Sequence, residues 1–208
     1  MAVLLGALVL LVLASPLDDL AGASRLVIVA STVAFLLACL QQARYHPRLR
    51  LPARLMVMLW LALNLPLARP ESMWMTGAAA AVLAALNLGV LSLVAQRLLQ
   101  ADRVDSELLC SALGGYLLLG AFWAETYEVI GLMAPAAFSG PAGQTFGQST
   151  LLYFSFTTLT TTGYGDVTAV NPLVRMWAVF EAIVGTMYNA TVIARLVALY
   201  GSVLKRDE

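Results

Sequence analysis

The chain has 208 residues, of which 61% are hydrophobic and 12% are charged, and its mean hydropathy is +0.84. Soluble domains are about 45–50% apolar and about 25% charged, so this composition excludes a soluble globular protein, a disordered chain and a nucleic-acid-binding protein. Twelve basic and twelve acidic residues balance each other, which leaves no net charge to attract a polyanion. The composition therefore predicts an integral membrane protein.

Runs almost free of charged residues predict the membrane-spanning helices; the last of them holds one acid, Glu181, and the extension of the third holds Arg54. A helix needs about 20 mostly apolar residues to cross a bilayer. Six runs meet or approach this length, and they cover residues 1–17, 26–43, 55–68 (extended to 51), 72–96, 108–124 and 176–194. The third run is short and could instead be tilted or partly re-entrant. Residues 1–14 could be the core of a signal peptide, but no basic residue precedes them, so we expect a retained helix.

The positions of the basic residues predict the orientation in the membrane. With six spans and a cytoplasmic N-terminus, nine Lys and Arg residues lie on the cytoplasmic side and three lie outside. This asymmetry follows the positive-inside rule. Three tryptophans, Trp74, Trp123 and Trp177, then fall near the outer interface, where such rings prefer to lie. We expect both termini in the cytoplasm and a plasma membrane, with short loops that suit a bacterial inner membrane. Because the chain ends at Glu208, no attached cytosolic ligand-binding module is expected.

The segment between the fifth and sixth runs has the composition of a re-entrant loop. Glycine, proline, alanine and serine dominate residues 131–147, which predicts a loop. Residues 149–160 are apolar and threonine-rich, and they suffice for a short helix capped by Ser149 and Thr150 but not for a span. A chain that stops halfway across a membrane is tolerated where it lines a wet, protein-enclosed cavity. We therefore expect a short helix that enters the membrane and an extended chain that returns.

The extended return contains the residues needed to replace the water around a cation. Its sequence is Thr161-Thr162-Gly163-Tyr164-Gly165-Asp166. Successive carbonyl oxygens face one side only if the backbone alternates between conformations, and Gly163 and Gly165 reach the costly ones freely. Thr161 adds a hydroxyl oxygen at the inner end, and Tyr164 points its ring outward to brace the loop. Asp166 concentrates cations at the outer mouth, and the short helix directs the negative end of its dipole at the same cavity.

This run resembles the selectivity filter of the potassium channel family, which is typically T-V-G-Y-G, with Thr162 in place of valine. The resemblance covers residues 107–200. It implies an all-α membrane protein with six transmembrane helices and a re-entrant pore helix and filter between helices five and six. It implies that K⁺ binds at Thr161, Thr162, Gly163 and Tyr164, with Gly165 completing the filter. One chain supplies one filter and the family's pore has four, so it also implies a homotetramer.

The implied organisation has two domains joined by a linker. Residues 1–100 form a four-helix membrane domain, residues 101–106 a linker, and residues 107–208 a pore domain. Within the pore domain we expect an outer helix at 107–130, a pore helix at 149–160, the filter at 161–165 and an inner helix at 172–200. A voltage sensor needs a ladder of basic residues along the fourth helix, but residues 72–96 contain none. We therefore expect weak voltage dependence or none.

The inner helix carries three features that each have two interpretations. Gly185 is a gating hinge, as the resemblance implies, or a site of close packing against the pore helix. Thr186, Asn189 and Ile193 share one helical face, where they line a wet cavity below the filter or form interhelical hydrogen bonds. Glu181 is an acid inside a span, and we expect it to support the filter rather than bind ions. Its candidate partners are pore-helix hydroxyls: Ser155, Thr157 and Thr158.

Polar residues elsewhere in the spans suggest helix contacts. Asn64 and Asn87 are expected to join helices by hydrogen bonds. Glu125 and Glu128 either brace the pore loop or lie on a solvated face near the outer end of the fifth span. Cys39 and Cys110 lie in apolar runs and are expected to pack as small hydrophobic residues.

The function that these features favour is passive K⁺ conduction through a homotetrameric pore in a lipid bilayer. The alternatives are a weakly selective monovalent cation channel and a non-conducting membrane subunit. No pattern of catalytic or metal-ligating residues rises above background, so we expect neither an enzyme nor a cofactor, and K⁺ is expected only as the permeant ion.

Overall fold

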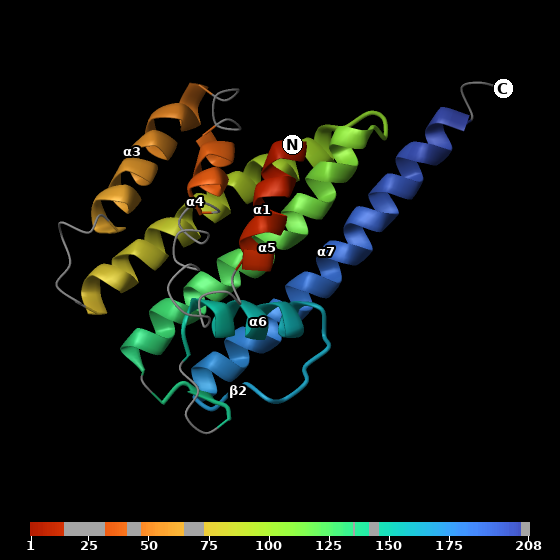
Figure 1. The fold of residues 1–208 in the computed structure, drawn as a ribbon. Helices are drawn as coiled ribbons and strands as arrows, with labels where there is room; N and C mark the ends of the chain where they lie inside the picture. Colours follow the sequence, from red (N-terminus) through yellow and green to blue (C-terminus); the bar gives the residue numbers. More distant parts are fainter. Residues whose placement is uncertain (15–31, 41–46, 65–72, 135, 142–145, 205–208) are drawn as a thin grey trace.

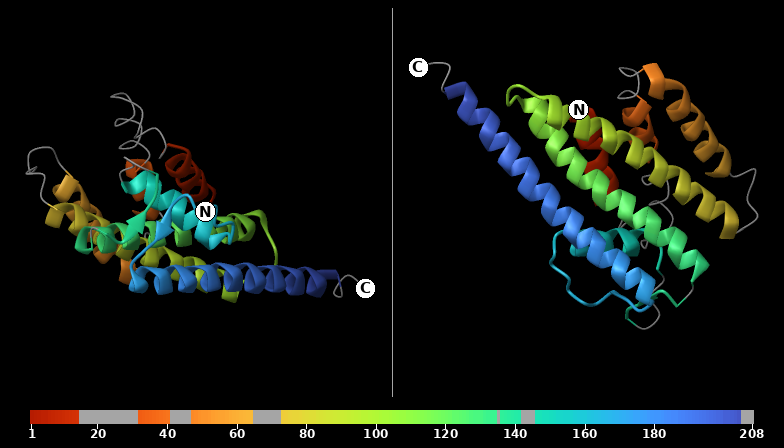
Figure 2. Two further views of the ribbon diagram at one scale, coloured as in Figure 1. Left: turned by 90° about the horizontal axis from the view of Figure 1, so that it is seen from below. Right: turned by 180° about the vertical axis from the view of Figure 1, so that it is seen from behind.

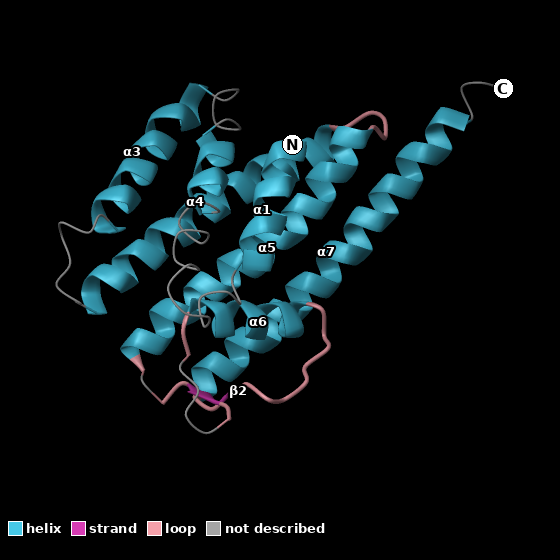
Figure 3. Ribbon diagram, in the orientation of Figure 1, coloured by secondary structure: helices cyan, strands magenta, loops and turns pink. Residues whose placement is uncertain are grey.

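The computed structural model describes residues 1–14, 32–40, 47–64, 73–134, 136–141 and 146–204. Within these ranges the fold is all-α apart from one short pair of strands (Figure 1 and Figure 3). The labelled elements are α1 (Ala2–Ala14), α3 (Pro47–Asn64), α4 (Met73–Gln100), α5 (Ser106–Met133), β1 (Phe138–Ser139), α6 (Gln148–Leu159), β2 (Thr168–Ala169) and α7 (Pro172–Leu204). Residues 32–40 are also helical, which brings the helical segments of the described ranges to seven.

Three helices are long and apolar enough to cross a membrane, namely α4, α5 and α7 over Met73–Gln100, Ser106–Met133 and Pro172–Gly201. They correspond to the fourth, fifth and sixth predicted spans. The apolar parts of α1 and α3 are shorter. Residues 15–31, 41–46 and 65–72 lie outside the described ranges, so the count of six spans stays a prediction.

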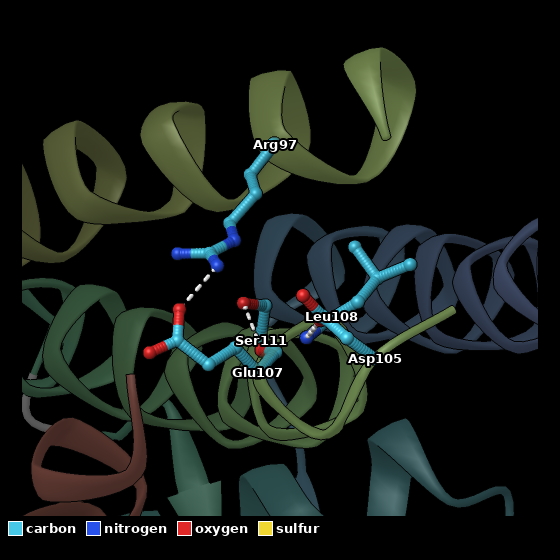
Figure 4. A network of polar contacts seen from close by, with 5 residues as sticks. All are labelled: Arg97, Asp105, Glu107, Leu108 and Ser111. Atoms are coloured by element: carbon cyan, nitrogen blue, oxygen red, sulfur yellow. Dashed lines mark hydrogen bonds and ion pairs between the residues drawn. The ribbon is translucent and has the colours of Figure 1, made fainter. Parts of the chain in front are cut away.

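The long helices run in alternating directions. Helix α5 returns antiparallel to α4 after a short turn, and α7 runs antiparallel to α5 (Figure 1 and Figure 2). At the turn, Asp105 caps α5 by accepting a hydrogen bond from the Leu108 amide, and Arg97 of α4 pairs with Glu107 of α5 (Figure 4). Helix α3 packs against α4, and α1 packs against α5.

Helix α6 lies across α5 and α7 rather than along them (Figure 1). Its apolar side chains enter a buried cluster with residues of α5 and α7, and this cluster includes Leu119, Tyr127, Phe154, Leu159 and Val174. Burial of this kind is worth about 1.5–3 kcal/mol for each large side chain. The cluster therefore fixes where the C-terminal end of α6 lies.

The start of α6 differs from the sequence prediction. The helix begins at Gln148 after Gly147, whose backbone is extended and which provides no side-chain cap. Ser149 and Thr150 consequently lie inside the first turn, so their predicted capping role is wrong. The helix starts one residue earlier than Ser149 because the extended backbone of Gly147 takes the N-cap position.

The segments before α6 and after the loop are joined by backbone pairing. Strand β1 pairs antiparallel with β2, with Phe138 opposite Ala169 and Ser139 opposite Thr168. The amide of Val170 also donates to the carbonyl of Ala137, at 2.8 Å. These bonds hold both ends of the loop that contains α6 against each other, and they place the start of α7 beside the end of α5.

Helix α7 is poorly covered by the rest of the chain. Only 11% of its most apolar window is buried, compared with 61% for α5. Its exposed apolar side chains include Leu173, Met176, Ile183, Met187 and Ile193. A spanning helix of this kind has a large apolar surface to bury against lipid or another chain.

Candidate functional site: the loop between α6 and α7

The backbone of the loop alternates in conformation. Positive φ angles occur at Thr161 (58°), Gly163 (51°) and Gly165 (81°), which are every second residue. The two glycines adopt this region at low cost. A β-branched residue rarely does, and strain of this type costs about 1–3 kcal/mol. The sequence pointed to the glycines but gave no sign that Thr161 also adopts a positive φ.

The amide groups at the start of the loop face back towards α6. The Thr161 amide donates to the carbonyl of Thr158 at 2.9 Å. The amides of Thr162 and Gly163 both donate to the carbonyl of Thr157, at 2.8 and 3.0 Å. The last carbonyls of a helix have no partner within it, so the loop satisfies two of them. Thr157 and Thr158 thus contact the loop through their backbones.

The carbonyl groups of the same loop remain available. Within the described residues, the carbonyls of Thr161, Thr162, Gly163 and Tyr164 accept no hydrogen bond, and all four residues are exposed in the single chain. Each carbonyl oxygen has two lone pairs that can accept a hydrogen bond or bind a cation. A row of unpaired carbonyls beside a membrane-spanning helix is therefore suited to bind a group that offers positive charge.

Tyr153 of α6 holds the outer end of the loop. Its hydroxyl donates to the Asp166 carboxylate, at 2.9 and 3.0 Å from the two oxygens. Its ring stacks on Tyr164, with centroids 6.4 Å apart and planes 3° from parallel. The Tyr164 side chain is 73% exposed, and among the described residues the ring that it contacts is that of Tyr153. Tyr153 was not among the predicted site residues; its one signal in the sequence is its place in the predicted pore helix, two positions before Ser155.

Glu181 is fully buried behind α6. It accepts hydrogen bonds from the hydroxyls of Ser155 in α6, at 2.5 Å, and Tyr127 in α5, at 2.6 Å. Ser155 was among its predicted partners, and Tyr127 was not. The Ser155 hydroxyl also lies 2.8 Å from the carbonyl of Gly120. One carboxyl group therefore links the pore-loop helix to both long helices of this region.

The other two predicted partners of Glu181 are not bonded to it. The Thr157 hydroxyl donates to the Phe154 carbonyl of its own helix, at 3.0 Å. Thr157 lies two positions after Ser155 and therefore does not face the same side of the helix, and among the described residues the Thr158 hydroxyl forms no hydrogen bond with Glu181. The support that Thr157 and Thr158 give to the loop comes from their carbonyls instead.

Gly185 lies against the end of α6. A Cβ atom at this position would be 2.5 Å from the carbonyl oxygen of Leu159 and 2.8 Å from one of its side-chain carbons. Side-chain and backbone atoms cannot approach so closely, so glycine permits α7 to touch α6 here. The same Leu159 carbonyl accepts a hydrogen bond from Tyr116 of α5, at 3.1 Å. The structure thus shows the close packing that was one interpretation of Gly185, and the hinge interpretation stays untested.

The face below the loop is open in the single chain. Thr186, Asn189 and Ile193 are all exposed, and the Thr186 hydroxyl donates to Ala182 in its own helix, at 2.8 Å. No interhelical hydrogen bond from these three residues is present among the described residues. This placement leaves them free to line a cavity.

Further along α7, Arg195 reaches the end of α4. Its guanidinium donates to the carbonyls of Leu98, Leu99 and Ala101, at 3.4, 3.0 and 2.9 Å. A cation favours the C-terminal end of a helix dipole. Arg195 therefore joins the inner helix α7 to the end of α4 and to the linker that leads into the outer helix α5.

Two findings define the class of this protein. Its three long apolar helices, with the shorter helix α6 packed against two of them, are features of a membrane protein. Residues 112–201 match the family model described as Ion channel, and this stretch contains most of α5, all of α6, the loop and most of α7. The chain matches no curated protein and no solved structure. Residues 112–201 are therefore an ion-channel domain.

Proposed function

We propose that the protein is a potassium-selective channel that conducts K⁺ passively through a homotetrameric pore. Its selectivity filter is residues 161–165, and the ions bind to the carbonyl oxygens of Thr161, Thr162, Gly163 and Tyr164. The observation that carries the proposal is the arrangement of the loop, in which amides bond back to α6 while these four carbonyls stay unpaired. In this proposal the channel lies in a bacterial plasma membrane with both termini in the cytoplasm.

A dehydrated cation needs several oxygen atoms around it, and one chain supplies them on one side only. The remaining ligands would come from three identical subunits arranged about a symmetry axis. Two observations support this assembly: the loop is exposed in the single chain, and α7 leaves most of its apolar surface uncovered. Tyr164, which meets open space on one side, would pack against the adjacent subunit.

The surrounding residues would have distinct roles in conduction. Asp166, held by Tyr153, would concentrate cations at the outer mouth. The negative end of the α6 dipole would favour a cation below the filter. Thr186, Asn189 and Ile193 would line the cavity there. Glu181 would keep α6 in place through Ser155 rather than bind an ion.

The test is ion flux through purified protein in liposomes. We expect K⁺ flux that barium blocks and a reversal potential that follows K⁺ when Na⁺ replaces it on one side. Gly163→Ala should abolish this selectivity, because alanine disfavours the positive φ by about 1–2 kcal/mol although no atom lies within 4 Å of its Cβ. Gly201→Ala is the matched control, since that glycine also has no neighbour within 4 Å and has no positive φ.

Other results of these experiments would favour an alternative to the proposed function. A reversal potential that does not distinguish K⁺ from Na⁺ would replace the proposal with a weakly selective cation channel. Absence of flux from protein shown to be folded and tetrameric would replace it with a non-conducting membrane subunit. A purified protein that is monomeric in detergent and in lipid would contradict the shared pore.

A further inference from the structure

Asn87 of α4 and Glu125 of α5 meet inside the membrane-spanning region. Both helices are candidate spans, and the two side chains are almost completely buried, with 0% and 6% of their surfaces exposed. The Asn87 Nδ2 atom is 2.9 Å from each carboxyl oxygen of Glu125. Asn87 therefore joins two helices, as its sequence position suggested. Glu125 does not lie on a solvated face, and among the described residues its side-chain hydrogen bonds are with Asn87 and not with the pore loop.

If Glu125 is ionised, one polar atom of this pair has no hydrogen-bond partner. The Asn87 Oδ1 atom is buried and has no hydrogen-bond partner among the described residues. A carboxylate only accepts hydrogen bonds, so it cannot satisfy that oxygen. A neutral carboxylic acid can donate its hydrogen to Oδ1 while it accepts one from Nδ2, after rotation about the terminal bonds of the two side chains. The neutral acid satisfies every polar atom of the pair.

The charges around the pair also favour a neutral acid. No Lys or Arg side chain in the described part of the chain forms an ion pair with Glu125, and the ion pair found there joins Arg97 to Glu107. Among the described residues, the ionisable groups that act on Glu125 electrostatically are Glu128, on the same helix, and Cys39, in the helical segment 32–40. Neither group can supply a positive charge. An unpaired buried charge is costly, and more so in a membrane.

We propose that Asn87 and Glu125 form a proton-binding site inside the membrane, in which Glu125 is a neutral acid paired reciprocally with the Asn87 amide. The bound proton holds the front helices against the outer helix of the ion-channel domain. Loss of the proton would leave Oδ1 unpaired and a charge without a counterion at this contact. The inference concerns the α4–α5 contact and does not depend on the proposed potassium selectivity.

Infrared spectroscopy of the full-length protein in liposomes tests the proposal. A protonated carboxyl has a carbonyl band distinct from those of a carboxylate. At neutral pH we expect Glu125→Gln to remove one such band per chain from the wild-type spectrum. Glu107→Gln is the matched control on the same helix, because Glu107 pairs with Arg97 and is partly exposed; it should remove carboxylate bands only.

A second variant keeps the proposal testable if Glu125→Gln fails to fold. Asn87→Leu has a similar volume and removes the amide partner, so the protonated-carboxyl band should shift to the frequency of a less strongly hydrogen-bonded acid. The proposal is overturned if Glu125→Gln removes carboxylate bands alone. It is equally overturned if Asn87→Leu leaves every protonated-carboxyl band in place.

Discussion

Replacement of Gly185 by alanine tests the contact between the inner helix and the end of α6. The new Cβ would lie 2.5 Å from the Leu159 carbonyl oxygen, whereas ordinary contacts begin at 3.4 Å. The obstructing atom belongs to the backbone and cannot rotate away. Helix α7 would have to move away from α6 by roughly 1 Å, and close-packed protein interiors resist such a shift.

The cost follows from two opposing effects. Overpacking of a tight contact costs about 1–3 kcal/mol, whereas alanine is favoured over glycine inside a helix by about 1 kcal/mol. Gly201→Ala gains the same helical preference without any contact, since no atom lies within 4 Å of its Cβ. The difference in unfolding free energy between the two variants should therefore be about 1–3 kcal/mol, with Gly185→Ala the less stable.

The assay combines thermal denaturation of the purified variants with flux through liposomes. Because Leu159 directly precedes the loop, we expect Gly185→Ala also to reduce K⁺ selectivity. If Gly185→Ala were as stable as Gly201→Ala and equally selective, the packing argument would be refuted. A change restricted to the open probability would favour the hinge instead.

Four further perturbations have defined outcomes. Glu181→Val should cost about 1–3 kcal/mol because it leaves the Tyr127 hydroxyl unpaired, whereas Glu181→Gln keeps an acceptor and should cost less; equal denaturation curves for both would contradict the network. Tyr153→Phe keeps the ring stack but releases Asp166, so single-channel conductance at low K⁺ should fall, while Tyr200→Phe, at an exposed position, should leave it unchanged. Arg195→Gln should alter the open probability without changing the reversal potential. Arg195→Lys should not restore the wild-type open probability, because an ammonium lacks the planar fork of donors. An unchanged open probability in Arg195→Gln would argue against coupling through α4. Voltage steps should have little effect on opening, since the described part of α4 carries its single basic residue, Arg97, in the last turn; steep gating that disappears when a basic residue in the first four spans is neutralised would disprove this.

The local features of the ion-channel domain could be predicted from the sequence. Helix α6 lies within one residue of its expected position at both ends, because its apolar run is bounded by a glycine-rich loop and by the T-T-G-Y-G sequence. Gly163 and Gly165 adopt positive φ angles as expected, since no other residue type does so at low cost. The bond from Ser155 to Glu181 could be anticipated because an acid inside a span needs a polar partner.

Features that depend on how helices pack could not be predicted in this way. Asn87 and Glu125 are 38 positions apart, and their contact depends on the rotation of α4 against α5. Tyr127 reaches Glu181 across 54 positions for the same reason. The positive φ of Thr161 opposes its own local preference and accompanies a hydrogen bond from its amide to the Thr158 carbonyl. Single-residue preferences carry no information about such constraints.

The hydrogen bonds of the loop amides also affect how the loop interacts with anions. Three consecutive N–H groups, from Thr161 to Gly163, already bond to the carbonyls of Thr157 and Thr158. A chloride ion that approached the open side of these residues would meet lone pairs and no backbone donor. Exclusion of anions would then follow from peptide geometry alone, before any comparison of one cation with another.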